Sequence, residues 1–218
     1  MKNRPHVTII TPTYNRLKSL KEAVDCVQKQ TYPYWEHIIV ADGPDPRVER
    51  LVRNLNDKRV RYFYTPRSKN WGSSQRNLGL KKARGKFVAC LDDDNTIRKD
   101  YVKEMVKRFT SKKIGYVICY VRYHTSYVLK PKLPFEIGGI DMLNFMVRKE
   151  LAKGMGGWTS EYIQDFILID KVSKISKGRF VKKILGKHGR LKQAKLERIV
   201  SYISLYAAKL ANKIGIYK

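Results

Sequence analysis

Three consecutive aspartates, Asp92 to Asp94, are the residues of this chain whose type and spacing point most clearly to chemistry. They follow the apolar run 87–91, which is flanked by Gly85 and Asn95 and is typical of a buried strand. In a parallel sheet, ligands bind at the carboxyl ends of the strands, where these side chains would lie. Adjacent carboxylates repel one another unless a cation or solvent neutralises them. The triplet therefore predicts either a solvated turn or a site for a hard divalent metal. In a chain with a net charge of +27 such an acidic cluster is not expected by chance, and the metal is favoured because other segments point to the same place.

Two further polar segments follow apolar runs in the same way. The segment 11–15, Thr-Pro-Thr-Tyr-Asn, comes after the run 7–10, and Asp42 comes after the run 37–41. Either segment alone would fit a turn or a helix cap, a common use of Asn and Asp. Because the carboxyl ends of parallel strands meet at one edge, the three clusters together predict a single convergent site.

The spacing of apolar residues predicts the elements that would position these clusters. Short apolar or alternating runs predict strands, and apolar residues recurring every three or four positions predict helices. The predicted strands are 7–10, 37–41, 59–64 and 87–91, and the predicted helices are 17–27, 46–55, 70–83 and 98–109. Ser19 and Glu22 are expected to form a capping box in the first helix. This alternation predicts an α/β fold with a central, mostly parallel sheet flanked by helices.

The second half of the chain has a different pattern. The segment 114–128 is rich in Tyr, Val and Ile and predicts a hairpin. The apolar segment 140–147 predicts an extended structure, with a helix as the alternative. After the glycine-rich segment 154–157, Thr159 or Ser160 is expected to cap a helix that runs to about residue 173.

The overall composition restricts the class of protein. Lys and Arg number 46 against 19 acidic residues, so a polyanionic neighbour is expected: nucleic acid, an anionic membrane surface or phosphorylated ligands. A hydrophobic content of 43% supports a packed core. No signal-peptide pattern and no apolar run of the roughly 20 residues needed to span a bilayer occurs in the sequence. We expect a cytoplasmic protein, or one that is peripheral on the cytoplasmic face of a membrane.

Cysteine and histidine residues give no metal-binding or disulfide pattern. Three cysteines stand singly within apolar segments, and buried free thiols are expected for Cys26, Cys90 and Cys119. Four histidines are scattered without ligand spacing, and structural or solvent-facing roles are expected for His6, His37, His124 and His188.

The ordered motifs of the chain resemble the family-2 inverting glycosyltransferases of the GT-A fold. The resemblance is carried by Thr-Pro-Thr-Tyr-Asn-Arg at 11–16, Ala-Asp-Gly at 41–43, Asn70-Trp71-Gly72 with Arg76-Asn77, Gly85-Lys86-Phe87 and Leu91-Asp92-Asp93-Asp94. The ordered set is specific, whereas Asp-X-Asp alone occurs often by chance. It implies one catalytic domain over 1–180, with a nucleotide-sugar-binding part over about 1–113 and an acceptor-side part over about 114–180.

The resemblance implies a nucleotide-sugar donor held by the first half of the chain. Tyr14, with Pro12 and Thr13 beside it, would stack on the nucleotide base. Asp42 would accept a hydrogen bond from the base imide, which favours uracil and therefore a UDP-sugar. Arg76 would lie by the base or the diphosphate, with a solvated arginine on a helix face as the alternative.

For the triplet, the resemblance implies divided roles. Asp92 would contact the ribose, and Asp94 would bind Mn²⁺ or Mg²⁺. The metal would neutralise the diphosphate as it leaves. Asp93 would belong to the same binding site or have a structural role only.

Inverting transfer needs a base that takes the proton from the acceptor hydroxyl. The family has a carboxylate on a helix after the acceptor-binding region, often as Glu-Asp, and the matching dipeptide here is Gln164-Asp165. Asp165 is therefore the predicted base, with a solvated helix carboxylate as the alternative. Gln164 departs from the pattern and leaves Glu161, one helical turn earlier, as a rival. Trp158 would stack on the acceptor sugar or fill the core.

Residues 181–218 are expected to form a basic, amphipathic helical tail. Its apolar positions recur with helical spacing between 196 and 214, with cations beside them. Such a helix suits an anionic bilayer surface, or it docks on the catalytic core with its charges solvated. A glycan or lipid-linked acceptor would fit the membrane alternative.

Three other classes of protein remain as alternatives. A nucleotidyltransferase would share the strand-end carboxylates, but it usually has a Gly-rich phosphate loop, and the segment 11–16 contains no glycine. A nucleic-acid-binding protein is suggested by charge alone, without a recognition motif, so no specific nucleic-acid partner is expected. A non-catalytic module that binds a nucleotide sugar without transferring it would carry the same motifs.

Overall fold

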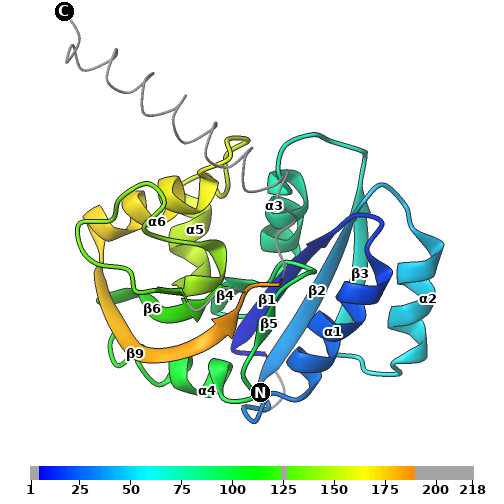
Figure 1. Ribbon diagram of the computed structural model, residues 1–218, viewed down its shortest axis with the longest axis horizontal. Helices are drawn as coiled ribbons and strands as arrows, with labels where there is room; N and C mark the ends of the chain where they lie inside the picture. Colours follow the sequence, from blue (N-terminus) through cyan, green and yellow to red (C-terminus); the bar gives the residue numbers. More distant parts are fainter. Residues whose placement is uncertain (1–4, 124–126, 190–218) are drawn as a thin grey trace, which may run out of the picture.

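The computed structural model describes residues 5–123 and 127–189, which form a curled mixed sheet with helices on both faces (Figure 1). The order of the strands along the sheet is β3-β2-β1-β4-β8-β6-β9-β5, with β7 paired to β6. The strands are β1 (Val7–Thr13), β2 (Trp35–Asp42), β3 (Val60–Thr65), β4 (Phe87–Cys90), β5 (Thr96–Ile97), β6 (Ile114–Arg122), β7 (Val128–Leu129), β8 (Phe145–Arg148) and β9 (Lys177–Lys187).

The first half of the chain forms a parallel sheet, as the alternation of elements predicts. Strands β3, β2, β1 and β4 are all parallel, and helices connect them. These helices are α1 (Leu17–Gln28), α2 (Pro46–Asn54) and α3 (Ser73–Lys82). In the register of the strands, Thr13 pairs with Ala41 and Ile10 pairs with Cys90. The polar segments that follow β1, β2 and β4 therefore lie at the same edge of the sheet.

The second half of the chain extends this sheet with mixed pairing. Strand β8 is antiparallel to both β4 and β6, β9 is parallel to β6, and β5 is antiparallel to β9. The predicted hairpin is confirmed, because β6 pairs antiparallel with β7. The predicted extended segment 140–147 holds a short 3₁₀ helix, η1 (Met142–Asn144), and most of β8.

Apolar side chains on the two faces of the sheet form two core clusters. One face packs against α1, α2 and α4 (Tyr101–Val106), and it buries Leu20, Val48 and Met105. The other face packs against α3, α5 (Lys149–Gly154) and α6 (Gln164–Ile175). None of the helices within the described part of the chain has the length and apolarity of a membrane span.

Helix α3 lies unusually close to β1, and a glycine permits this. A Cβ atom added to Gly79 would lie 2.5 Å from Cγ2 of the buried Ile10. Real Cβ atoms do not approach other atoms this closely, so a larger residue would push α3 away from the sheet. The close approach matters because α3 carries Arg76.

The element boundaries differ from the sequence expectation at three places. No capping box forms in α1, where Ser19 Oγ donates a hydrogen bond to the Arg16 carbonyl instead. Helix α6 begins at Gln164 and not at Thr159 or Ser160. The expected boundary at residue 180 falls inside β9, so residues 181–187 are strand and not the start of a helical tail. The other residues of the expected tail, 190–218, lie outside the described residues.

Candidate active site

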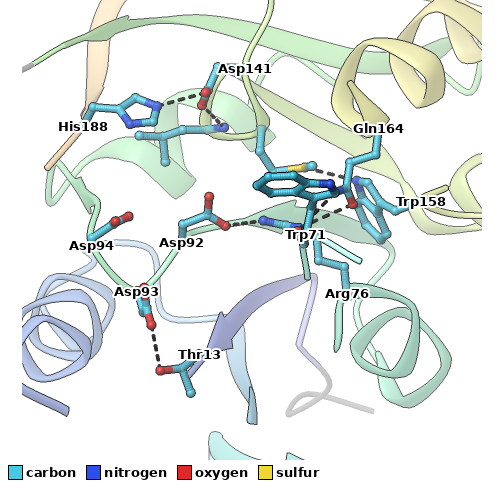
Figure 2. A network of polar contacts seen from close by, with 12 residues as sticks. Thr13, Trp71, Arg76, Asp92, Asp93, Asp94, Asp141, Trp158, Gln164 and His188 are labelled. Atoms are coloured by element: carbon cyan, nitrogen blue, oxygen red, sulfur yellow. Dashed lines mark hydrogen bonds and ion pairs between the residues drawn. The ribbon is translucent and has the colours of Figure 1, made fainter. Parts of the chain in front are cut away.

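The three aspartates that follow β4 make different contacts (Figure 2). Asp93 is buried and points toward β1, where Thr13 Oγ1 donates a 2.8 Å hydrogen bond to its Oδ2. Burial raises the pKa of Asp93 above its ordinary value. Asp94 is partly exposed, and Arg16 Nη1 lies 2.7 Å from Asp94 Oδ2 and 3.1 Å from Asp93 Oδ1. Asp93 therefore fixes the triplet to the sheet, while Asp92 and Asp94 retain access to solvent.

A buried arginine connects Asp92 to α6 (Figure 2). Arg76 forms an ion pair with Asp92, and its Nη1 donates hydrogen bonds to the Trp71 carbonyl at 2.7 Å and to Gln164 Oε1 at 3.4 Å. Gln164 Nε2 donates a 3.1 Å hydrogen bond to the same carbonyl. Arg76 is 5% exposed, so the alternative of a solvated arginine on a helix face is wrong. This network joins the strand-end carboxylates to the start of α6.

Tyr14 and Asp42 line a pocket of about 340 Å³ at the ends of β1 and β2. Asp42 Oδ1 accepts hydrogen bonds from Ser68 N at 2.8 Å and from Gln75 Nε2 at 2.9 Å. Asp42 Oδ2 lies 3.0 Å from Arg67 Nη1, and the Arg67 guanidinium carbon lies 3.5 Å from the centroid of the Tyr14 ring. A nucleotide base bound as predicted must therefore displace Arg67 or share the Tyr14 ring and Asp42 with it.

Asp165 lies in the first turn of α6 and is partly buried. Its Oδ1 accepts a 2.8 Å hydrogen bond from the backbone N–H of Phe166. Burial, and then the negative charge of Asp141, raise the pKa of Asp165 to about 7, although the charge of Arg76 acts in the opposite direction. A carboxyl group with a pKa near 7 is suited to accept a proton at neutral pH.

Glu161 lies in a bend before α6 and not on the helix. The expectation that Glu161 precedes Asp165 by one turn on the same helix face is therefore wrong. Glu161 Oε2 is buried and has no hydrogen-bond partner within the described part of the chain. Glu161 nevertheless stays close to Asp165 in sequence and remains the rival carboxylate.

Two tryptophans have different surroundings. Trp158 is 3% exposed, its Nε1 donates to the Met142 sulfur at 3.1 Å, and its backbone N–H donates to Asn77 Oδ1 at 2.9 Å. It therefore fills the core, and the alternative of an exposed stacking surface is wrong. Trp71 is 46% exposed and meets the ring of Tyr162 edge to face, with 5.0 Å between the ring centroids. The exposed aromatic surface next to the Arg76 network is therefore that of Trp71 and not that of Trp158.

The end of β9 closes the site next to the triplet (Figure 2). His188 Nε2 lies 2.9 Å from Asp141 Oδ2, and the Tyr123 ring stacks on the imidazole with 4.4 Å between centroids. Burial disfavours the charged imidazole, but the charge of Asp141 raises the pKa of His188 above its ordinary value. A Cβ atom added to Gly189 would lie 1.9 Å from the Asp94 carbonyl oxygen, so the backbone here is in direct contact with the triplet.

The carboxylates fit one kind of metal site. Among residues 5–123 and 127–189, no group of three or more acidic, His or Cys side chains is arranged to hold a metal. Asp92 and Asp94, with side chains 30% and 24% exposed, offer two carboxylates. Mg²⁺ commonly binds one or two carboxylates and completes its coordination with water and substrate phosphates. The donor set fits a metal that binds together with a diphosphate.

The structure brings the predicted site residues to one edge of the sheet. Pro12 and Thr13 end β1, Tyr14 and Asp42 line the pocket beside them, and Arg76 links the triplet to the helix that carries Asp165. Sequence reasoning missed several neighbours of the site: Trp71, Tyr123, Asp141, Tyr162 and His188. Asp141 and Asn144 form a capping box on η1, which is a recognisable signal. His188 gives no signal of its own, because its place depends on the pairing of β9 with β6.

Comparison with known proteins places the chain in a family. The family model described as "Glycosyl transferase family 2" matches residues 8–171, and the chain belongs to this family. Its mixed α/β sheet with flanking helices is the GT-A fold of that family.

Individual relatives and structures agree with this assignment. The Campylobacter jejuni GalNAc(5)-diNAcBac-PP-undecaprenol beta-1,3-glucosyltransferase is 34% identical over 95 residues, which are 43% of this chain and 31% of that protein. TarS of S. aureus in complex with UDP-GlcNAc has a TM-score of 0.74 at 17% identity, over 94% of this chain and 66% of that one. The mannosyltransferase PcManGT of Pyrobaculum calidifontis, in complex with GDP-Man and Mn²⁺, has a TM-score of 0.73 at 19% identity. The match covers 89% of this chain and 59% of that one. The chain spans less than half the length of the curated relatives that it matches.

Proposed function

We propose that this chain is a metal-dependent, inverting glycosyltransferase of the hexosyltransferase type. It moves a sugar from a nucleotide-sugar donor, a UDP-sugar, to a hydroxyl of a glycan or lipid-linked acceptor. The observation that carries the proposal is the Arg76 bridge, which contacts Asp92 on one side and Gln164 on the other. It brings Asp165, with a pKa near 7, to the side of the carboxylates that bind the donor in this proposal.

The donor half of the proposal rests on the pocket at β1 and β2. The base stacks on Tyr14, between the ends of these strands, and its imide donates to Asp42. Thr13 lines the same pocket, and Pro12 precedes it in β1. Asp92 binds the ribose hydroxyls, and Asp93 positions the triplet through Thr13. The complexes of TarS with UDP-GlcNAc and of PcManGT with GDP-Man support a nucleotide-sugar donor.

Asp94 would hold Mn²⁺ or Mg²⁺ together with the donor diphosphate. Such a metal would neutralise charge on the leaving diphosphate. Arg16 lies on the Asp94 carboxylate, so the cationic side chain must move or share this carboxylate when the donor binds. The Mn²⁺ in the PcManGT complex supports a divalent metal.

Asp165 acts as the base in this proposal. Its ionised carboxylate takes the proton from the acceptor hydroxyl while the hydroxyl oxygen forms a bond to the anomeric carbon and the diphosphate leaves. Attack from the side opposite the diphosphate inverts the anomeric configuration. The undecaprenol-linked acceptor in the name of the Campylobacter relative supports a lipid-linked acceptor.

The test is a thermal-shift panel of UDP, GDP, UDP-sugars and GDP-mannose, each with and without Mn²⁺. A ligand that binds only the folded chain raises its melting temperature, so the donor identifies itself. We expect the largest shift for a UDP-sugar with Mn²⁺, and a loss of that shift in Asp94→Ala. The Asp42→Asn variant should weaken binding of uridine nucleotides about tenfold or more, because a charged hydrogen-bond acceptor is lost.

The outcomes separate the parts of the proposal. If Mn²⁺ raised the melting temperature of Asp94→Ala with the donor as much as that of the unmodified chain, the metal assignment would be rejected. A larger shift for GDP-mannose would reject uracil recognition by Asp42. Binding without transfer to any hydroxyl acceptor would leave a nucleotide-sugar-binding module without catalytic activity.

A further inference from the structure

A second hollow, of about 880 Å³, lies along β9 outside the nucleotide pocket. Its walls come from β5, β6 and β9 and the residues that follow β5 and β7. Half of the lining residues are Lys or Arg, and none is Asp or Glu. The lining residues that carry the inference are Arg98, Arg122, Lys130, Lys182, Lys183 and Lys187, and we name this hollow the β9 groove.

Among the residues that the structure describes, most of these cations have no acidic partner. Arg98 pairs with Asp100 at 2.9 Å, and Lys183 pairs with Glu104 at 3.0 Å. The other four, Arg122, Lys130, Lys182 and Lys187, are exposed and form no ion pair with the described residues. A concave surface lined by charges of one sign concentrates the electrostatic potential, and it attracts ligands of the opposite sign.

One end of the β9 groove adjoins the active site. Lys187 pairs with Arg122 across β6 and with Thr96 across β5, and it directly precedes His188. Thr96 is two residues after Asp94. From this end the groove follows β9 to Lys182, about 15 Å away at the usual rise of a strand.

We propose that the β9 groove binds an acidic glycan, with carboxylate or phosphate groups along its length, as the extended part of the acceptor. This inference rests on the proposed function, because the acceptor hydroxyl must reach Asp165 while the rest of the chain lies along β9. The unpaired cations Lys182 and Lys187 lie on β9, with Arg122 and Lys130 on the neighbouring segments, and such a series matches charges that repeat along a polymer. A groove encloses a single chain, whereas a flat bilayer would contact only its rim.

The experiment measures binding of a fluorescent polygalacturonate oligosaccharide to the full chain by anisotropy. The variant is Lys182→Ala/Lys187→Ala. The matched control is Lys21→Ala/Lys58→Ala, which removes the same charge from exposed positions outside the groove. We expect the groove variant to bind at least about fivefold more weakly, with a shallower dependence on salt, while the control is unchanged. Binding of UDP should be the same in all three proteins.

Further probes identify the occupant. An uncharged malto-oligosaccharide of equal length should bind weakly to all variants, and equal binding of both probes would overturn the proposal. The same loss in the control as in the groove variant would also overturn it. Vesicles of equal parts phosphatidylglycerol and phosphatidylcholine, or a single-stranded oligonucleotide, test other polyanions. If the groove variant lost binding to the vesicles or to the oligonucleotide while it kept its binding to polygalacturonate, the groove would be assigned to a membrane or to nucleic acid. A chain that binds polygalacturonate through the groove but binds no nucleotide would contradict the proposed function and not the groove.

Discussion

Asp165 is the residue whose protonation should control the rate of transfer. Its pKa of about 7 means that the carboxylate becomes available as a base only as the pH rises through neutrality. We predict that the transfer rate of the unmodified chain rises with pH through about 7, and that Asp165→Asn lowers it about a hundredfold or more. The measurement is a pH series of product formation under saturating donor. Nucleotide binding should persist in the variant, and retained turnover would move the base to Glu161, which Glu161→Gln then tests.

The same substitution has a second readout that does not depend on activity. The folded carboxyl keeps its proton up to about pH 7, whereas the unfolded one ionises near 3.8. The folded state therefore binds more protons between these values, so ionisation of the unfolded chain destabilises the fold as the pH rises. Thermal melts should show Asp165→Asn gaining stability relative to the unmodified chain between about pH 4 and 7. If the difference in stability between Asp165→Asn and the unmodified chain stayed constant across this pH range, the Asp165 carboxyl would not be desolvated in the folded state.

Both polar atoms of the Gln164 side-chain amide form hydrogen bonds. Its amide nitrogen donates to the Trp71 carbonyl, and its amide oxygen accepts from Arg76. A glutamate here would lose the donor and add a negative charge beside Asp165. We predict that Gln164→Glu moves the rising part of the pH–rate profile to higher pH, because a nearby like charge disfavours ionisation of Asp165. Product formation across pH measures this, and an unchanged profile would show that Arg76 neutralises the new charge.

At the scale of elements, β9 matters because its end reaches the triplet. An added Cβ on Gly189 would lie 1.9 Å from the Asp94 carbonyl oxygen, so Gly189→Ala must displace one of the two segments. We predict a loss of about 1–3 kcal/mol in the free energy of unfolding and weaker binding of UDP with Mn²⁺. Thermal melts and nucleotide titrations measure both. The matched control is Gly154→Ala at the end of α5, whose added Cβ meets nothing within 4 Å, so this change should lower neither the free energy of unfolding nor the binding of UDP with Mn²⁺.

The elements also show how far the sequence predicts this structure. Strands β1, β2 and β4, with the polar segment after β1 and the carboxylates at the ends of β2 and β4, follow from local apolar patterns, so this side of the site is visible in the sequence. The capping of α6 was wrong because Thr159 and Ser160 lie in the connection before the helix, where tertiary contacts of Trp158 set the path of the chain.

The side of the site next to β9 is less visible for a physical reason. The basic composition of residues 181–187 predicts the start of the tail, but long-range pairing makes this segment the end of β9, and bulges shift its register against β6. His188 enters the site only through this long-range pairing, which no local spacing reveals. The sequence leaves Arg76 either at the nucleotide or on a solvated helix face, because its burial depends on contacts with Asp92 and Gln164 that are distant in sequence.

At the scale of the whole molecule, Gly189 is the last residue that the structure describes, and the basic segment 190–218 follows it in the sequence. We predict that a chain truncated after Gly189 melts near the full chain, whereas truncation after Gly186 removes Lys187 to Gly189. The second truncation leaves Asp141 without His188, at a cost of about 2 kcal/mol or more, or roughly 4–8 °C in melting temperature. Thermal melts and UDP titrations of both truncations measure this. Equal melting temperatures would mean that the end of β9 contributes little.

The truncation after Gly189 also tests the expected membrane role of the tail. We expect it to associate less than the full chain with anionic liposomes at low salt, as a peripheral protein of the cytoplasmic face would. Unchanged association would favour a tail that docks on the catalytic core.

The contact between Gly189 and Asp94 has a consequence for synthesis on the ribosome. The triplet is translated before the midpoint of the chain, but its neighbours His188 and Gly189 follow about ninety residues later. During that interval the nascent chain exposes the edge of β6, which β9 covers in the finished protein. Unpaired strand edges of this kind promote aggregation of partly folded chains. Pairing of β9 therefore both brings His188 and Gly189 to the site and covers an edge of β6 that would otherwise promote aggregation of the partly folded chain.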